Sequence, residues 1–206
     1  MPAVTRPRVA GIVLGAGSSR RLGRPKQTLP YRDTTLLGWT LRQACASSLA
    51  RVVLVVGGAA DEVVAGLEPG RAEVVRNEAY GTGCASSLQA GLDAAEGCDA
   101  VMILLADMPD LGPSVIDAVL DDWDRHRPWG AVTSYRGSPG HPFVFAAAAF
   151  PTLRALHGDK AVWKLVEGRP DGTGPDHLRR VPLDVALPPD VDTWADYERA
   201  LAGREG

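Results

Sequence analysis

The stretch VAGIVLGAGSSRRLGRPK, at residues 9–26, decides the fold. It begins with a short apolar run, Val9–Leu14, and continues directly into a glycine-rich loop. An apolar strand that ends in glycines is typical of the first strand of a parallel sheet, where ligands bind at the carboxyl ends of the strands. The stretch therefore predicts an α/β fold with a ligand site after this strand.

Apolar runs alternate with amphipathic patterns along the rest of the chain. The runs that indicate strands are Arg51–Val56, Glu73–Arg76, Ala100–Leu105, 131–135, 142–145 and Leu178–Leu183. Helical spacing is clearest over residues 35–49 and 113–127. Ala100–Leu105 is almost wholly apolar, as expected of a strand covered by helices on both faces. We expect a Rossmann-like three-layer sandwich with a mixed, mostly parallel sheet, in one domain over residues 1–206.

Composition and charge exclude several classes of protein. The chain has 206 residues and a net charge of −3, which argues against a nucleic-acid or anionic-membrane binder. Its three cysteines, Cys45, Cys84 and Cys98, form no CxxC pair, so neither a disulfide framework nor a zinc ribbon is indicated. The N-terminus lacks an apolar signal segment, and no apolar run reaches about 18 residues. We therefore expect a cytoplasmic protein.

The loop at residues 14–26 is suited to a polyphosphate. Gly15 and Gly17 allow backbone amides to approach a ligand closely, and Ser18 and Ser19 add hydroxyl groups. The cations of the loop are Arg20, Arg21, Arg24 and Lys26. The spacing fits neither a Walker A loop nor a dinucleotide fingerprint. A glycine turn with a solvated basic surface is the alternative interpretation.

Two segments further along the chain carry polar residues beside expected elements. In NEAYGTGCASSL, at residues 77–88, Asn77 offers an amide to a base edge, although a capped loop explains the pattern equally well. Asp107 directly follows the apolar run Ala100–Leu105, where a sheet delivers metal or phosphate ligands. Its alternative role is that of a helix N-cap.

The loop matches one family far better than these general motifs. The pattern Leu14-Gly15-Ala16-Gly17-x-Ser19-x-Arg21-Leu22-Gly23-x-x-Lys26 resembles the signature of the nucleotidyltransferases, and within them most that of the molybdenum cofactor cytidylyltransferases. Gly15 and Leu22 depart from the Ala and Met that are usual there. Five later segments also resemble family motifs: NEAYGTGCASSL at 77–88, LADMP at 105–109, GHP at 140–142, LHGDKA at 156–161 and DVDT at 190–193, ahead of Asp196. Ala161 replaces a customary glycine.

The resemblance implies a set of site residues. Nucleotide-binding roles fall to Leu14, Gly15, Ala16, Gly17, Ser18, Ser19, Arg21, Lys26, Asn77, Gly81 and Ser86. Catalytic roles fall to Arg21, Lys26 and Asp107. His141 and Asp159 are implied to bind the acceptor. Mg²⁺ is implied on Asp107 and Asp192, with Asp190 left open as the second ligand.

The resemblance also implies an activity: transfer of a nucleoside monophosphate, CMP from CTP, onto a phosphorylated small molecule, with molybdopterin as acceptor and pyrophosphate as product. A guanylyltransferase, another small-phosphate nucleotidyltransferase and a non-catalytic nucleotide-binding cofactor chaperone are the alternatives. The expected partners are the NTP and the acceptor, with docking to a molybdoenzyme or its chaperone, and neither nucleic acid nor membrane.

Overall fold

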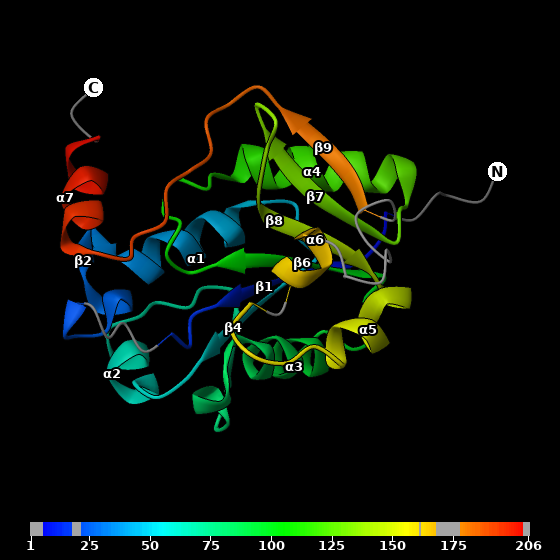
Figure 1. Ribbon diagram of the computed structural model, residues 1–206. Coiled ribbons are helices and arrows are strands. Elements are labelled where there is room, and N and C mark those ends of the chain that lie inside the picture. The colour runs from blue at the N-terminus through cyan, green and yellow to red at the C-terminus, as the bar shows by residue number, and fades with distance from the viewer. Residues whose placement is uncertain (1–5, 18–21, 161, 168–177, 204–206) are drawn as a thin grey trace.

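A computed structural model describes residues 6–17, 22–160, 162–167 and 178–203. In this part of the chain, seven strands form one sheet in the order β5-β4-β1-β6-β8-β7-β9 (Figure 1). Their bounds are β1 Val9–Leu14, β4 Arg51–Val56, β5 Glu73–Arg76, β6 Ala100–Leu105, β7 Gly130–Tyr135, β8 Ser138–Ala146 and β9 Leu178–Leu183. Only β8 runs antiparallel to its neighbours, β6 and β7. The expected mixed, mostly parallel sheet is confirmed.

Helices cover both faces of this sheet. One face carries α1 (Leu36–Ala46), α2 (Ala60–Ala65) and α4 (Pro113–His126), and the other carries α3 (Cys84–Ala94), α5 (Phe150–Arg154) and α6 (Trp163–Glu167) (Figure 1). Successive residues of β1 alternate between the two cores: Val13 packs with the first set of helices and Ile12 with the second. The three-layer sandwich is confirmed.

The β7–β8 hairpin is longer than its sequence indicates. The apolar run predicts a strand at 142–145, but β8 begins at Ser138 and pairs Ser138 with Tyr135. The two turn residues, Arg136 and Gly137, have φ values of 47° and 97°, which is the geometry of a tight hairpin turn. This turn closes the hairpin beyond the apolar run, where residues 138–140 resemble a loop in composition.

A small C-terminal layer lies beside the sheet. A two-stranded ribbon, β2 (Pro30–Tyr31) with β3 (Thr34–Thr35), packs with α7 (Trp194–Ala202) around a core of Tyr31, Leu36, Val191 and Ala200. Helix α7 begins with a capping box, in which the Thr193 side chain accepts from the Asp196 amide and the Asp196 carboxylate accepts from the Thr193 amide. This box fixes the segment just before it, residues 190–192. In the described residues, no helix is both long and apolar enough to cross a membrane.

Candidate active site at the carboxyl ends of β1 and β6

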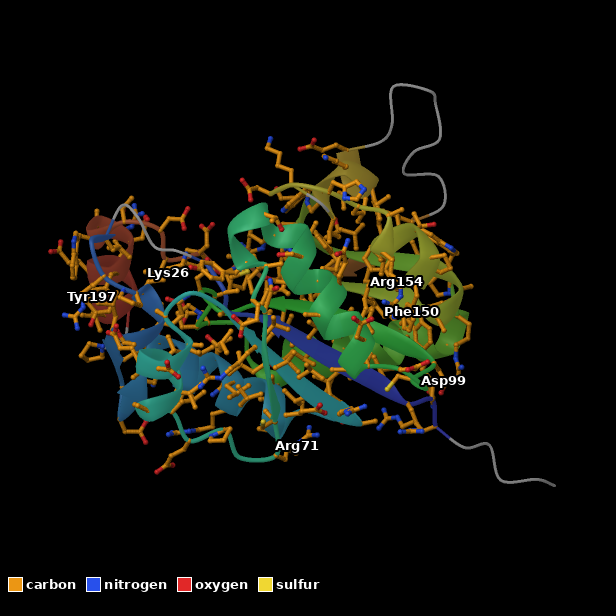
Figure 2. The ribbon with its side chains drawn as sticks, turned by 90° about the horizontal axis from the view of Figure 1, so that it is seen from below. Lys26, Arg71, Asp99, Phe150, Arg154 and Tyr197 are labelled. Atoms are coloured by element: carbon orange, nitrogen blue, oxygen red, sulfur yellow. The ribbon has the colours of Figure 1, made fainter. Side chains whose placement is uncertain are left out.

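The sheet reverses its winding direction between β1 and β6. From β1 the chain proceeds through β4 to β5 on one side, and then returns to place β6 on the other side of β1. The loops after β1 and β6 therefore diverge, and ligands of open α/β sheets bind at such a switch point. Figure 2 shows Lys26 at this end of the molecule, beside Tyr197 of α7, whereas Asp99, just before β6, lies at the opposite end.

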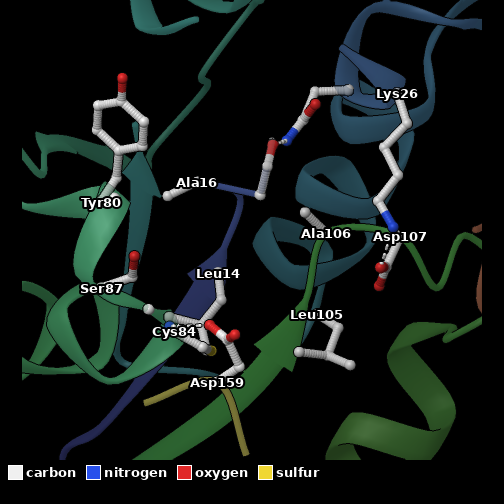
Figure 3. A pocket seen from close by; sticks show the side chains of 14 residues that line it. Leu14, Ala16, Lys26, Tyr80, Cys84, Ser87, Leu105, Ala106, Asp107 and Asp159 are labelled. Carbon is white, nitrogen blue, oxygen red and sulfur yellow. Dashed lines mark hydrogen bonds and ion pairs between the residues drawn. The ribbon is translucent and has the colours of Figure 1, made fainter. Parts of the chain in front are cut away.

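A cavity of about 530 Å³ opens at the switch point. Residues from the loop after β1, the loop after β6, the start of α3 and the α5–α6 connection line it: Leu14, Ala16, Gly17, Lys26, Gln27, Tyr80, Gly81, Gly83, Cys84, Ser87, Leu105, Ala106, Asp107 and Asp159. Seven of the residues that the sequence assigned to a site, from Leu14 to Asp159, are among them. The cavity thus gathers distant motifs into one place, as Figure 3 shows.

Lys26 connects three segments at one wall of this cavity. Its Nζ donates to Asp107 Oδ2 at 2.5 Å, to Asp192 Oδ1 at 2.8 Å and to the Val191 carbonyl at 3.0 Å. The lysine side chain is only 13% exposed. Burial alone would lower the pKa of Lys26, but the charges and hydrogen bonds of Asp107 and Asp192 outweigh it and raise that pKa above its usual value. Lys26 is therefore a charged ammonium held against two carboxylates.

The backbone holds Asp192 beside Asp107. The Val191 amide donates to the Asp107 carbonyl at 2.9 Å, and Val191 itself is buried. Asp190, on the other side of Val191, is raised in pKa by burial and by the charges of Asp107 and Asp192. Of the two candidates that the sequence left open, the structure places Asp192 in the ion pair with Lys26.

One oxygen of Asp107 fits a metal ligand. Asp107 Oδ1 is buried and, among the residues that the structure describes, has no hydrogen-bond partner. A carboxylate oxygen left in this state carries a desolvation cost that a bound cation would remove. The described residues contain no group of three or more His, Cys, Asp or Glu side chains arranged to hold a metal. The two carboxylates of Asp107 and Asp192 nevertheless suit Mg²⁺, because this ion binds one or two carboxylates and takes its other ligands from phosphates and water.

The glycine loop is braced from inside the protein. The Gly15 amide donates to the Val55 carbonyl at 2.8 Å, so this N–H serves the fold rather than a ligand. A Cβ on Gly15 would lie 3.2 Å from that same carbonyl, which explains the glycine. Gln27, which is buried, donates to the carbonyls of Gly15 at 2.8 Å and Gly17 at 2.9 Å. Within the glycine-rich stretch at residues 15–17, Ala16 and Gly17 line the cavity.

Asn77 supports the second loop rather than lining the cavity. Its amide donates to the hydroxyls of Ser86 at 2.8 Å and Ser87 at 3.0 Å, and its Oδ1 accepts from the Ala79 amide. Ser86 in turn donates to backbone carbonyls of the same loop. Of the serines in this segment, Ser87 faces the cavity, with Gly81 nearby. The amide of Asn77 and the hydroxyl of Ser86 are thus engaged within their own segment. The expected serine cap is wrong, because α3 begins at Cys84 after Gly83 without a side-chain cap, and Ser86 lies inside the helix.

Asp159 reaches the cavity from the α5–α6 connection. Its Oδ1 accepts from the Cys84 amide at 3.3 Å at the start of α3, and the Ala85 amide donates to the Gly158 carbonyl. Gly83, at φ 112°, has no room for a side chain here because a Cβ would lie 3.0 Å from Asp159 Oδ1. Burial, with the charges of Asp159 and Asp107, raises the pKa of the Cys84 thiol. The connection therefore closes the cavity on the side opposite Lys26.

His141 lies in the core, away from the cavity lining. Its ring stacks on Phe143 at 4.0 Å between centroids, and its Nδ1 lies 3.2 Å from the Ile103 carbonyl. Because a carbonyl only accepts, Nδ1 carries the proton. Burial lowers the pKa of His141 to about 4, so the ring is neutral near pH 7.

Some residues of the sequence prediction cannot be placed, and others were missed. Ser18, Ser19 and Arg21 lie outside the described residues, as does Ala161. Gln27 and Cys84 line the cavity but were not assigned to it, and Tyr80 and Ser87 line it from the segment at 77–88 although neither was named as a site residue. Tyr80 rests on a glycine pair, since a Cβ on Gly58 would lie 2.5 Å from its ring. The adjacent glycines at 57–58, directly after a strand, are the sequence signal for this close approach.

Comparison with known proteins places the chain in a family of enzymes. The MobA-like NTP transferase domain matches residues 11–176. The chain is 33% identical over 173 residues to a nicotine blue oxidoreductase of Paenarthrobacter nicotinovorans, covering 80% of this chain and 84% of that protein. It is 26% identical over 134 residues to the molybdenum cofactor cytidylyltransferase of Escherichia coli, covering 65% and 67%. A probable molybdenum cofactor guanylyltransferase of Mycobacterium avium is 34% identical over 117 residues, covering 53% and 54%.

Solved structures agree over almost the whole chain. The crystal structure of Rv0371c from Mycobacterium tuberculosis is 40% identical, with a TM-score of 0.85, and covers 96% of this chain and 100% of its own. A structure of Rv0371c in complex with manganese is 37% identical, with a TM-score of 0.81, and covers 95% and 98%. The fold and the family match define an α/β enzyme of the nucleotidyltransferase class. The chain belongs to the MobA-like NTP transferase family of nucleotidyltransferases, and the resemblance of its motifs is confirmed.

Proposed function

We propose that the chain transfers CMP from CTP onto a phosphorylated small molecule, with molybdopterin as the acceptor, in a Mg²⁺-dependent reaction that releases pyrophosphate. The observation that carries this proposal is the meeting of Lys26, Asp107 and Asp192 at the wall of the switch-point cavity. At this wall, a cation that can bind phosphates lies next to two carboxylates that can bind a metal. Phosphoryl-type transfer needs this combination of positioning and charge neutralisation.

In the proposed reaction, a phosphate oxygen of the acceptor forms a bond to the α-phosphorus of CTP. The bond from that phosphorus to the bridging oxygen breaks, and pyrophosphate leaves with the electron pair. Because a phosphate monoester is already largely ionised at pH 7, the step requires no general base. The placement of His141 in the core, as a neutral ring, is consistent with this chemistry.

In the proposed reaction, different residues of the cavity bind the triphosphate and the metal. The backbone at Ala16 and Gly17 faces the triphosphate, and Lys26, with Arg21 of the same loop, neutralises its charge. Asp192 and Asp107, the latter through the Oδ1 that has no partner in the described part of the chain, would hold Mg²⁺. When bound, Mg²⁺ supplies positive charge at the reacting phosphates. The manganese complex of Rv0371c supports a divalent cation in this fold.

The choice of CTP rests on the resemblance of the loop to that of the cytidylyltransferases and on Ala16, which lines the cavity. The methyl group of Ala16 leaves less space for a base than a glycine would, which favours the smaller pyrimidine ring. The cytidylyltransferase of Escherichia coli is consistent with this choice, while the mycobacterial guanylyltransferase keeps GTP as the alternative.

The test is a titration of the full-length protein with CTP, GTP and ATP by calorimetry, followed by pyrophosphate release with Mg²⁺ and the molybdopterin acceptor. We expect CTP to bind most tightly and to be the nucleotide consumed. Equal or tighter binding of GTP would contradict the choice of base, and an absence of binding by every NTP would contradict the function.

A second candidate comes from the relative named nicotine blue oxidoreductase. The same cavity would then hold a redox partner of the substrate, and a reduced pyridine dinucleotide is the hydride donor to test. Titration with NADH and NADPH under the same conditions separates the two. Tighter binding of a pyridine dinucleotide than of CTP would favour the second candidate.

A further inference from the structure

We propose that Lys26 occupies the two carboxylates of the divalent-cation site in the nucleotide-free protein, so that Asp107 and Asp192 accept the metal only after a triphosphate draws the ammonium away. The inference rests on the metal site of the proposed function, and it adds that the nucleotide binds before the metal. Lys26 is then a gate for the metal as well as a phosphate ligand.

The geometry of the ion pairs carries the inference. One nitrogen lies 2.5 Å from Asp107 Oδ2 and 2.8 Å from Asp192 Oδ1 (Figure 3 shows the lysine directed at Asp107). Lys26 Nζ thus already compensates one oxygen of each carboxylate that would hold the metal, while Asp107 Oδ1 has no partner in the described part of the chain. A dication on the same two carboxylates would lie close to the ammonium, and the two positive charges would repel each other. Metal binding at Asp107 and Asp192 therefore favours a state in which Lys26 has left.

The negative charges of Asp107 and Asp192 explain why Lys26 stays at the carboxylates while no nucleotide is bound. Lys26 is mostly buried, and the carboxylates of Asp107 and Asp192 compensate for its loss of water. A triphosphate in the cavity offers several anionic oxygens in exchange. Its arrival both releases the carboxylates and supplies further oxygen ligands for the metal, so nucleotide and metal binding are coupled.

The backbone allows the side chain to move without disturbing the loop. Lys26 begins a short 3-10 helix, Lys26–Thr28, and the next residue, Gln27, is tied to the carbonyls of Gly15 and Gly17. The root of the lysine is therefore fixed to the loop that faces the triphosphate, while its flexible four-carbon stem reaches across to Asp107. Gly17, Lys26 and Asp107 all line the same cavity, so the ammonium can pass from carboxylates to phosphates along one wall.

Binding of Mn²⁺ to the nucleotide-free protein tests this inference by a readout other than activity. Free Mn²⁺ is measured by electron paramagnetic resonance at pH 7.5 with the full chain and with Lys26→Met. We expect Lys26→Met to bind Mn²⁺ at least about tenfold more tightly than the wild type, because a competing charge at contact distance has been removed. Lys26→Gln, which keeps hydrogen-bond donors without the charge, should behave in the same way and serves if Lys26→Met does not fold.

Lys160→Met is the matched control. Lys160 is exposed, follows the cavity residue Asp159, and makes no ion pair within the described residues, so its loss should leave Mn²⁺ affinity unchanged. Unchanged or weaker Mn²⁺ binding by both Lys26 variants would overturn the gate while leaving the metal site in place. If no variant and no wild-type protein binds Mn²⁺, even with CTP present, the metal site of the proposed function fails as well.

Discussion

Asp107 and His141 come from neighbouring strands and both belong to family-like motifs, yet their surroundings differ in kind. Asp107 follows the end of β6, pairs with Lys26 and keeps one buried oxygen without a partner in the described structure. His141 lies within β8, between Phe143 and Trp163, with its Nδ1 proton directed at the Ile103 carbonyl. The comparison shows that a motif residue past the end of a strand is available for chemistry, whereas one inside the strand is committed to the core.

Replacing Asp107 should have the largest effect. Asp107→Asn keeps the shape of the side chain but removes the charge opposite Lys26, and we expect turnover to fall about 100-fold or more, as for other preorganised electrostatic groups. Pyrophosphate release measures this. Asp192→Asn should behave similarly and Asp190→Asn more mildly. An Asp107→Asn protein with undiminished, Mg²⁺-dependent turnover would remove Asp107 from the site.

His141 should control stability in mild acid. The pKa of about 4 in the folded protein lies below the usual 6.5, so the unfolded chain binds the proton more readily between these values. The free energy of unfolding should therefore fall by about 3 kcal/mol as the pH drops from 6.5 to 4, at roughly 1.4 kcal/mol per pH unit. Urea unfolding across this range measures it. The loss should disappear in His141→Phe and persist in His157→Asn, where the histidine is exposed; an equal loss in His141→Phe would contradict the buried, neutral ring.

The next largest effect is expected from replacing Lys26, and it concerns nucleotide binding. Lys26→Ala removes a charge-assisted contact to phosphate and should weaken CTP binding by about 1.5–3 kcal/mol, roughly 10- to 150-fold. Calorimetry measures the affinity, with Lys160→Ala as the control for charge alone. If Lys26→Ala binds CTP as the wild type does, the lysine serves only the two carboxylates.

Asn77 should affect the fold more than the ligand. Asn77→Ala leaves the hydroxyls of Ser86 and Ser87 and the Ala79 amide without their partners, so the free energy of unfolding should fall by about 1–3 kcal/mol. Ser87→Ala, at a residue that faces the cavity, should alter CTP affinity with a smaller loss of stability. If Asn77→Ala instead loses much of its CTP affinity and keeps its stability, the amide of Asn77 contacts the base directly, as the sequence predicted.

Much of the sheet could be predicted because its central strands are buried on both faces. The bounds of β1, β4 and β6 coincide with largely apolar runs in the sequence, and the bounds of the half-exposed edge strand β5 were also as predicted. The ribbon β2–β3 and the short helices α5 and α6 were not predicted, since elements of so few residues carry little periodicity. The start of α7 was missed too, although Thr193 and Asp196 have the spacing of a capping box.

The residues of the site were easier to predict than the contacts between them. Motif resemblance pointed to Lys26, Asp107 and Asp192 one at a time, but their mutual ion pairs depend on residue 191 docking against residue 107. Such long-range contacts leave no local pattern. For the same reason the sequence could not show that the amide of Asn77 is engaged within its own loop, or that the ring of His141 packs in the core.

The central claim is that the switch-point cavity binds a nucleotide with a divalent cation on Asp107. A crystal of the protein grown with Mn²⁺ and a non-hydrolysable CTP analogue, measured for anomalous scattering at the manganese edge, tests it most directly. We expect a manganese peak bonded to the Asp107 carboxylate, with the triphosphate beside Ala16 and Gly17 and the Lys26 ammonium moved onto the phosphates. A manganese site away from Asp107, or a nucleotide bound outside this cavity, would contradict it.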